Sequence, residues 1–191
     1  HFADIPFFRV DDGWDMEAPY HLETQGVLGS PMLENGANQS HYFHIHPPVY
    51  YVGLAMVYKL AGFGWVQGRF YSIFIGLFSI WIFFLILKAL DLDKKLSFGF
   101  IVLLYTTVPL FYVMSKTIRP DILMLAWASL SYWLLLKWLK GYHVKYLFLG
   151  AGVNALMMMT HMYGIPLVLL WAYEMIRHRK WKAVAGFASI S

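Results

Sequence analysis

A pair of neighbouring carboxylates near the start of the chain is the first feature that could do chemistry. Asp11 and Asp12 stand side by side in the stretch RVDDGWDME, residues 9–17. Adjacent carboxylates raise one another's pKa, and a carboxyl group tuned in this way can serve as a general base. The structural alternative is an acidic, solvated helix start, in which one of the two caps a helix that runs toward Gly26.

Three histidines within six residues form a second candidate site. They lie in the stretch HYFHIHPP, residues 41–48. Imidazole is a common metal ligand, but spacings of three and two match no well-defined zinc site. The spacing leaves a metal site open, with His44 and His46 as the residues that could ligate a metal ion. The alternative is that His46 contacts an anionic group of a substrate.

The stretch SKTIRPD, residues 115–121, joins two apolar runs and carries both signs of charge. The guanidinium of Arg119 offers a fork of donors that suits a phosphate, and Lys116 is a second cation nearby. Asp121 follows Pro120 and is expected to begin the next helix, where a carboxylate is favourable. The alternative is that these charges are anchors at a membrane boundary.

A fourth candidate is His161, in the stretch THMYG within the otherwise apolar run 146–173. An ionisable group inside an apolar run indicates a functional site. The alternative is a histidine that lies near lipid headgroups at a turn of the chain.

The composition indicates a membrane protein as the setting of these residues. Hydrophobic residues make up 59% and charged residues 14% of the 191 residues, against roughly 25% charged residues in globular proteins. The chain has no cysteine, which excludes a disulfide, a thiolate nucleophile and a cysteine-ligated metal. Seven of the eleven acidic residues precede residue 35, a distribution that favours membrane orientation over nucleic-acid binding.

The apolar runs predict an all-α fold, a polytopic transmembrane helix bundle, because a spanning helix needs about 20 mainly apolar residues. Pro109 should kink the second span. Gly164 and Pro166 interrupt the long run 146–173, which favours a helical hairpin over one tilted span. The spans expected are residues 70–88, 96–115, 121–139, 146–159 and 163–176, with another starting at 183.

Ten of the fifteen Lys and Arg residues follow the first, third and hairpin segments in three groups. The positive-inside rule places these groups in the cytoplasm. Residues 1–69 then form the first extracytoplasmic loop, and the 115–121 turn lies on the same side. Residues 48–65 are expected to form an interfacial helix, because Lys59 interrupts them and glycines end them early. The missing initiator Met and the unfinished last apolar run indicate a piece of a longer protein, one part of a larger single membrane domain.

The order of these features resembles a known family. An Asp-Asp loop start, a His-Pro-Pro before an interfacial helix, Arg69 opening the next span and an Arg-Pro-Asp at 119–121 occur in sequence. This order is similar to the N-terminal part of the C-type (GT-C) membrane glycosyltransferases. The nearest branch is that of the bacterial dolichyl-phosphate-mannose-protein mannosyltransferase-like enzymes, which includes the aminoarabinose transferase of lipid A. The resemblance extends from about Val10 to Arg177.

The resemblance implies transfer of a sugar from a polyprenyl-phosphate donor to a lipid, protein or glycan acceptor, with inversion, on the extracytoplasmic face. Asp11 matches the family's catalytic carboxylate, and Asp12 is the alternative base because it replaces a more frequent Glu. Asp121 matches the family's second acidic position and is expected to be a further catalytic residue, and His46 matches the basic residue before Pro-Pro. Ile45 stands where some relatives carry an acidic metal ligand. The remaining acids of the segment are read as a helix surface: Asp15, Glu17 and Glu23.

The growing negative charge on a leaving lipid phosphate needs nearby cations. The substrate-binding residues expected are His46, Arg69, Lys116, Arg119 and His161. No cofactor is demanded by the sequence, although a divalent metal ion stays open. The partners expected are the lipid-linked donor, the acceptor and membrane lipids, without nucleic acid, in a multi-pass protein of the bacterial inner membrane. A transporter or a non-catalytic membrane subunit is the alternative, and the uncharged spans 70–87 and 96–115 disfavour the transporter.

Overall fold

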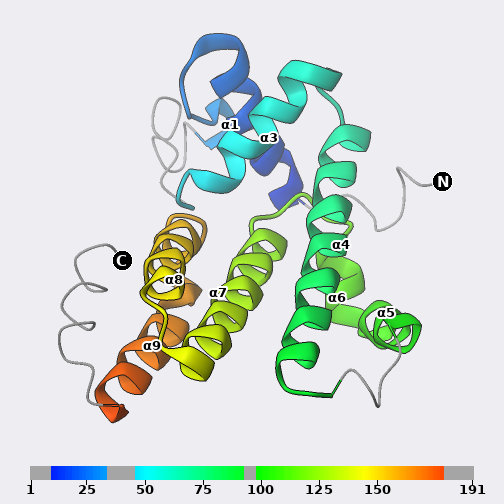
Figure 1. Ribbon diagram of the computed structural model, residues 1–191. Coiled ribbons are helices and arrows are strands. Elements are labelled where there is room, and N and C mark those ends of the chain that lie inside the picture. The colour runs from blue at the N-terminus through cyan, green and yellow to red at the C-terminus, as the bar shows by residue number, and fades with distance from the viewer. Residues whose placement is uncertain (1–9, 34–45, 93–97, 179–191) are drawn as a thin grey trace. The chain divides into compact units, whose positions relative to one another are not determined.

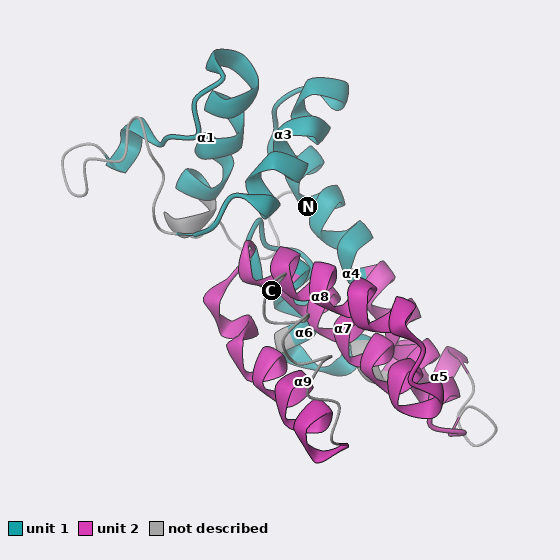
Figure 2. Cartoon of the chain, turned by 60° about the vertical axis from the view of Figure 1, so that its left-hand side comes forward, with its two compact units in different colours: residues 1–76, 106–123 teal, residues 77–105, 124–191 magenta. Residues whose placement is uncertain are grey.

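The computed structural model describes residues 10–33, 46–92 and 98–178. These residues form helices and turns, with no strand among them (Figure 1), so the all-α expectation is confirmed. His44 and the helix expected from residue 183 lie outside the described residues, as do the side chains of Asp11 and Asp12. The chain divides into two compact units: unit 1 is residues 1–76 with 106–123, and unit 2 is residues 77–105 with 124–191 (Figure 2).

Unit 1 begins with helix α1 (Val10–Gln25). Gly26 follows it with φ 71° and donates its N–H to the Leu22 carbonyl at 3.2 Å, a left-handed C-terminal cap that glycine adopts without steric cost. The helix therefore runs to Gly26, as the sequence predicts, and a 3₁₀ turn η1 (Pro31–Leu33) comes next. Asp11 and Asp12 belong to the first turn of α1.

Helix α3 (Val49–Ala61) packs on α1. It starts directly after Pro47-Pro48 and stops at Gly62, whose φ of 82° ends the helix while its N–H bonds to the Tyr58 carbonyl at 2.8 Å. The expected helix over 48–65 therefore forms, shortened at its C-terminal end. One face is buried, and it carries Tyr50, Tyr51, Leu54, Ala55 and Tyr58.

Helix α4 (Trp65–Ala89) is 25 residues long, with its first half in unit 1 and its second half in unit 2. At 1.5 Å per residue it is about 37 Å long, enough to cross a bilayer. Two glycines allow close packing within unit 1. A Cβ at Gly68 would lie 2.6 Å from the Ile118 side chain, and one at Gly76 would lie 3.1 Å from Ser115.

The apolar run expected as one kinked span is instead two helices, α5 (Phe98–Thr107) and α6 (Pro109–Met114). Val108 between them is extended, with φ −72° and ψ 114°. Proline lacks the N–H that would continue the helix and disfavours helical backbone in the residue before it. The interruption at Pro109 is thus stronger than a kink.

Unit 2 is built around α7 (Asp121–Gly141), α8 (Val144–Met158), the 3₁₀ turn η2 (Met162–Gly164) and α9 (Ile165–Arg177). Gly150 of α8 approaches the Trp171 ring of α9, and Gly164 approaches Met157. From residue 150 to residue 157 the partner moves back along the chain, from 171 to 164. The helices α8 and α9 therefore run antiparallel. The break expected near residues 161–164 and the helical hairpin around it are therefore present.

A hydrophobic core joins α7 to this hairpin. Its buried members are Leu134, Leu135, Trp138, Leu147, Ala151, Trp171 and Met175. Inside it the Trp171 indole donates to Ser131 Oγ at 2.9 Å, and Ser131 donates to Asn154 Oδ1 at 2.8 Å. The polar edge of the buried indole is thereby satisfied, as buried tryptophans usually require.

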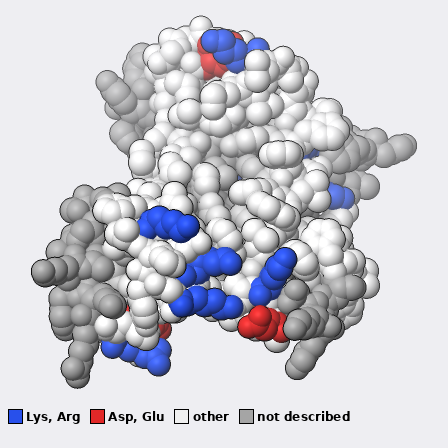
Figure 3. Space-filling view, in the orientation of Figure 1, with Lys and Arg blue, Asp and Glu red and all other residues white. Residues whose placement is uncertain are grey.

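The C-terminal ends of α4, α7 and α9 meet at one end of unit 2. Lys140 lies 3.8 Å from Asp91, and the Tyr142 hydroxyl lies 2.8 Å from His178 Nδ1. Lys and Arg side chains gather over these helices in the lower half of Figure 3. Within the described ranges, α4 and α7 are long and apolar enough to cross a membrane, whereas α3 and α8 are shorter apolar helices.

Candidate active site

A buried carboxylate lies between α1 and α3. Asp15 is 1% exposed, and its Oδ1 accepts a 2.5 Å hydrogen bond from the hydroxyl of the fully buried Tyr51. The assignment of Asp15 to a helix surface is therefore wrong. Asp15 shares the inward face of α1 with Ala18, Pro19 and Leu22, which follow it at helical spacing.

The two other acids read as helix surface differ from one another. Glu17 is half-buried and accepts hydrogen bonds from Ser30 Oγ and from the Met32 N–H at 3.1 Å. It therefore ties the chain around η1 back to α1. Glu23 is exposed, as expected.

The Tyr51 phenol stays protonated. Burial raises its pKa well above the ordinary value of 10, and the negative charges of Asp15 and Asp121 raise it further. Its neighbour Tyr50 also has a raised pKa through burial, against which a 3.3 Å hydrogen bond with Ser72 acts. Tyr51 is thus a permanent hydrogen-bond donor in a region that two carboxylates influence.

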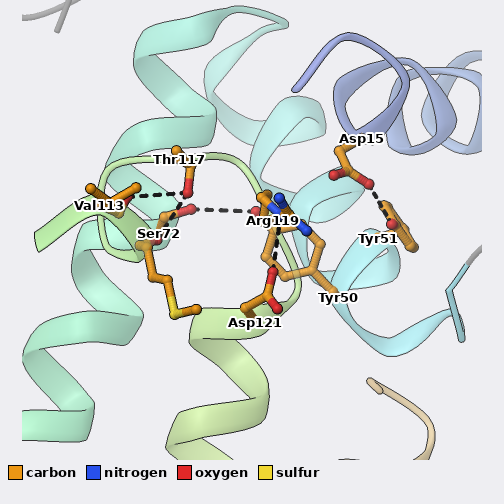
Figure 4. A network of polar contacts seen from close by, with 9 residues as sticks. Asp15, Tyr50, Tyr51, Ser72, Val113, Thr117, Arg119 and Asp121 are labelled. Atoms are coloured by element: carbon orange, nitrogen blue, oxygen red, sulfur yellow. Dashed lines mark hydrogen bonds and ion pairs between the residues drawn. The ribbon is translucent and has the colours of Figure 1, made fainter. Parts of the chain in front are cut away.

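The 115–121 loop brings a cation and an acid into the same region. Arg119 Nε donates to Asp121 Oδ2 at 3.0 Å, with side chains 30% and 16% exposed. Asp121 begins α7, as expected. The buried Thr117 donates to the Val113 carbonyl at 3.1 Å and anchors the loop on α6. Figure 4 shows this pair together with Asp15–Tyr51 and Tyr50–Ser72, drawn from α1, α3, α4 and the loop.

The other predicted cations of unit 1 have defined surroundings. Lys116 Nζ donates to the Tyr112 hydroxyl at 2.6 Å and lies 3.9 Å from the centre of its ring. Arg69 does not open α4 but lies four residues inside it, where it is 2% exposed and engaged in contacts with the protein. His46 is half-buried and also makes contacts.

Nowhere in 10–33, 46–92 and 98–178 do three or more His, Asp or Glu side chains gather as metal ligands. His46 is described, whereas its expected companion His44 is not.

Comparison with known proteins shows the family of the chain. A family model, the dolichyl-phosphate-mannose-protein mannosyltransferase family, matches residues 45–189. The chain belongs to this family. No curated protein and no solved structure matches it.

Membership of the dolichyl-phosphate-mannose-protein mannosyltransferase family confirms the resemblance inferred from the sequence. The family comprises integral membrane glycosyltransferases of the GT-C type, and α4 and α7 are apolar helices of spanning length. The matched stretch contains His46, Arg69, Arg119 and Asp121. The first-loop acids precede it.

His161 of this mannosyltransferase family member lies in unit 2, whereas the residues above lie in unit 1. It precedes η2, its Nδ1 accepts the Tyr163 N–H at 3.3 Å, and its ring packs on the Tyr163 ring at a tilt of 37°, with 4.3 Å between centres. It is 9% exposed. His161 therefore caps the N-terminus of η2, and its role in substrate binding stays a prediction.

Unit 2 of this mannosyltransferase family member also contains an apolar cavity of about 480 Å³. It lies among α4, α7 and the α8–α9 hairpin, and Ser129, Tyr132 and Tyr163 are among its lining residues. The wall residues include Phe83, Ile86, Ala128, Met157, Leu167 and Leu170.

Two of the residues that gather here were missed by reasoning from the sequence of this family member. Asp15 occupies a position on the apolar stripe of α1, and a charged residue on such a stripe indicates a buried partner. Tyr51 sits among the apolar residues of α3 and gives no signal of its own. Its partnership with Asp15 depends on tertiary packing.

Proposed function

We propose that this protein transfers a sugar from a polyprenyl-phosphate donor to an acceptor on the extracytoplasmic face of the bacterial inner membrane, with inversion at the anomeric carbon. The observation that carries the proposal is the Arg119–Asp121 pair, beside a buried carboxylate, in a member of a membrane mannosyltransferase family. Such a region offers a cation for a phosphate and acids for an acceptor hydroxyl.

Asp11 is the proposed general base, with Asp12 as the alternative. Both belong to the first turn of α1, the helix that Asp15 attaches to α3. The base takes the proton of the acceptor hydroxyl as its oxygen attacks the anomeric carbon. The bond from that carbon to the phosphate oxygen breaks on the opposite side, and the lipid phosphate leaves with the electron pair.

Arg119 is the proposed partner of the leaving phosphate. A guanidinium has five N–H donors in a fixed fork, so Asp121 can hold Nε in place while the group also meets an anion. Lys116, His46 and Arg69 are proposed as further cations around the phosphate. Their charge stabilises the negative charge that grows on the leaving group.

The mainly apolar lining of the cavity in unit 2 suits the hydrocarbon chain of a lipid. The basic end of unit 2 is proposed to face the cytoplasm. Residues 1–69 and the loop 115–121 are then extracytoplasmic.

The proposal is tested with the full-length protein in membranes, supplied with a lipid-linked sugar and scored for transferred sugar. Asp11→Asn should lower the rate about 10²–10⁴-fold, the range for loss of a general base. Glu23→Gln is the matched control, because it removes an exposed acid from the same helix. Full transfer by both Asp11→Asn and Asp12→Asn would refute the role of the pair. NMR of the product reports whether the anomeric configuration is inverted.

A further inference from the structure

We propose that Asp15 and Tyr51 form a positioning pair that holds the first turn of α1 against α3, and with it the carboxylates Asp11 and Asp12. The inference rests on the proposed function and adds to it two residues that the chemistry itself does not consume. Neither Asp15 nor Tyr51 takes the acceptor proton. Their task is to keep the proposed base in place.

The geometry of the pair carries the proposal. Tyr51 Oη lies 2.5 Å from Asp15 Oδ1, across 36 residues of sequence, and both side chains are almost wholly buried. Hydrogen bonds to an ionised acceptor are shorter and about twice as strong as neutral ones. A contact of this kind fixes the rotation of α1 about its own axis more firmly than apolar packing alone.

The chemical state of the pair suits holding and not proton exchange. Burial and the negative charges nearby keep the Tyr51 hydroxyl protonated, so it donates to Asp15 throughout the physiological range. A carboxylate that already accepts a short hydrogen bond from a buried phenol is a poor choice of base. This leaves the proton transfer to a carboxylate elsewhere on α1.

The register of α1 connects the pair to the proposed base. Asp11 and Asp12 precede Asp15 by four and three residues, which is about one helical turn. The buried anchor therefore lies next to the turn that must be held still. A displacement of about 1 Å at a reacting group can cost about a hundredfold in rate.

The competing assignment makes Asp15 itself the base, and two substitutions separate the two assignments. Asp15→Asn keeps an oxygen that accepts from Tyr51 but cannot take up a proton. A positioning role predicts that Asp15→Asn keeps kcat within about threefold of wild type, while Asp15→Ala loses about tenfold or more. If Asp15→Asn falls as far as Asp15→Ala, the positioning role is overturned.

Tyr51→Phe tests the other half of the pair. It keeps the ring and removes the hydroxyl, so we expect kcat to fall about tenfold with the KM for the lipid-linked donor unchanged. Tyr58→Phe is the matched control. Tyr58 is also buried on α3, and its hydroxyl has no hydrogen-bond partner among the described residues. Equal kcat values for the two variants would overturn the proposal.

Hydrogen exchange of the same full-length variants gives a readout that does not depend on activity. The amides of α1 should exchange about tenfold faster in Tyr51→Phe than in Tyr58→Phe or wild type. If the wild-type protein transfers no sugar but α1 still exchanges faster in Tyr51→Phe, the proposed function is refuted and the positioning pair is retained. Unchanged exchange in α1 would overturn the pair, whatever the activity.

Discussion

Arg119 donates its Nε to the Asp121 carboxylate at 3.0 Å across the single residue Pro120. Both side chains are partly exposed, and an ion pair of this kind contributes only about 0–1 kcal/mol to stability. The pair is therefore better explained by the orientation that it gives the Arg119 guanidinium than by a contribution to the stability of the protein. Pro120 restricts the backbone between the two residues, so the guanidinium is presented at the start of α7.

The first prediction concerns the donor affinity that this arrangement would supply. Arg119→Ala should raise the KM for the lipid-linked donor about tenfold or more, because a hydrogen bond to a charged group contributes about 1.5–3 kcal/mol. Asp121→Asn should raise it less than threefold, since an amide oxygen still accepts from Nε. Steady-state kinetics with purified donor measure both values.

Lys59→Ala is the control for loss of a positive charge, because Lys59 is an exposed cation of the same unit. Its donor KM should match wild type. If Arg119→Ala and Lys59→Ala give the same donor KM, Arg119 does not hold the phosphate.

Much of the helical framework could be predicted because its signals are local. Gly26 and Gly62 end helices where the sequence indicated, and Asp121 begins one. The turn after His161 follows from Gly164 and a proline. Each of these depends on the backbone preferences of one or two residues, which the sequence displays directly.

The parts that could not be predicted depend on packing. Pro109 was expected to bend a span, and whether a proline bends or breaks a helix depends on what satisfies the freed backbone groups nearby. Asp15 was read as helix surface. Its place on the apolar stripe of α1 signals burial, but its partner Tyr51 is 36 residues away and is identified only by tertiary packing. The family order of motifs identified Arg119 and Asp121, but their contact with one another is visible only in the structure.

The second prediction concerns alkaline pH. Burial raises the pKa of Tyr50, Tyr51 and Tyr58 above the ordinary value of 10. An unfolded chain releases these protons near pH 10, whereas the folded protein retains them. Their contribution to stability is therefore fully present below pH 10 and is lost as the pH rises beyond it, at about 1.4 kcal/mol per unit for each tyrosine.

Thermal unfolding of the detergent-solubilised protein between pH 8 and pH 12 checks this expectation. Tyr58→Phe should reduce the alkaline slope of stability by about one proton relative to wild type. Below pH 9 it should raise stability by about 1 kcal/mol, because it removes a buried hydroxyl without a hydrogen-bond partner in the described residues. A slope identical to wild type would contradict the assignment of Tyr58 as a buried, protonated phenol.

The third prediction concerns the packing of the α8–α9 hairpin. A Cβ at Gly150 would meet the Trp171 ring, which is fully buried and hydrogen-bonded to Ser131. Because the ring cannot move without breaking that bond, Gly150→Ala should destabilise the protein by about 1–3 kcal/mol. Gly152→Ala, on the same helix with open space around it, should be neutral or stabilising by up to about 1 kcal/mol. Unfolding midpoints in detergent compare the two, and equal midpoints would show that α8 and α9 do not pack in this register.

The fourth prediction concerns membrane orientation. The α8 and α9 helices have 15 and 13 residues, about 22 and 20 Å, so each is shorter than a hydrocarbon core of about 30 Å. A hairpin of this length can reach the opposite surface only if the bilayer thins or flanking residues extend it. The location of η2 is therefore the decisive observation.

Single cysteines locate η2, and none of the 191 residues competes with them for labelling, since these residues include no cysteine. Tyr163→Cys on η2 and Lys140→Cys at the basic end replace side chains that are 67% and 55% exposed. In intact spheroplasts an impermeant maleimide should label Tyr163→Cys and should label Lys140→Cys only after the membrane is permeabilised. Labelling of Tyr163→Cys only after permeabilisation would make the hairpin re-entrant from the cytoplasm. The basic residues after α9 would then lie in the cytoplasm although the hairpin does not cross the membrane.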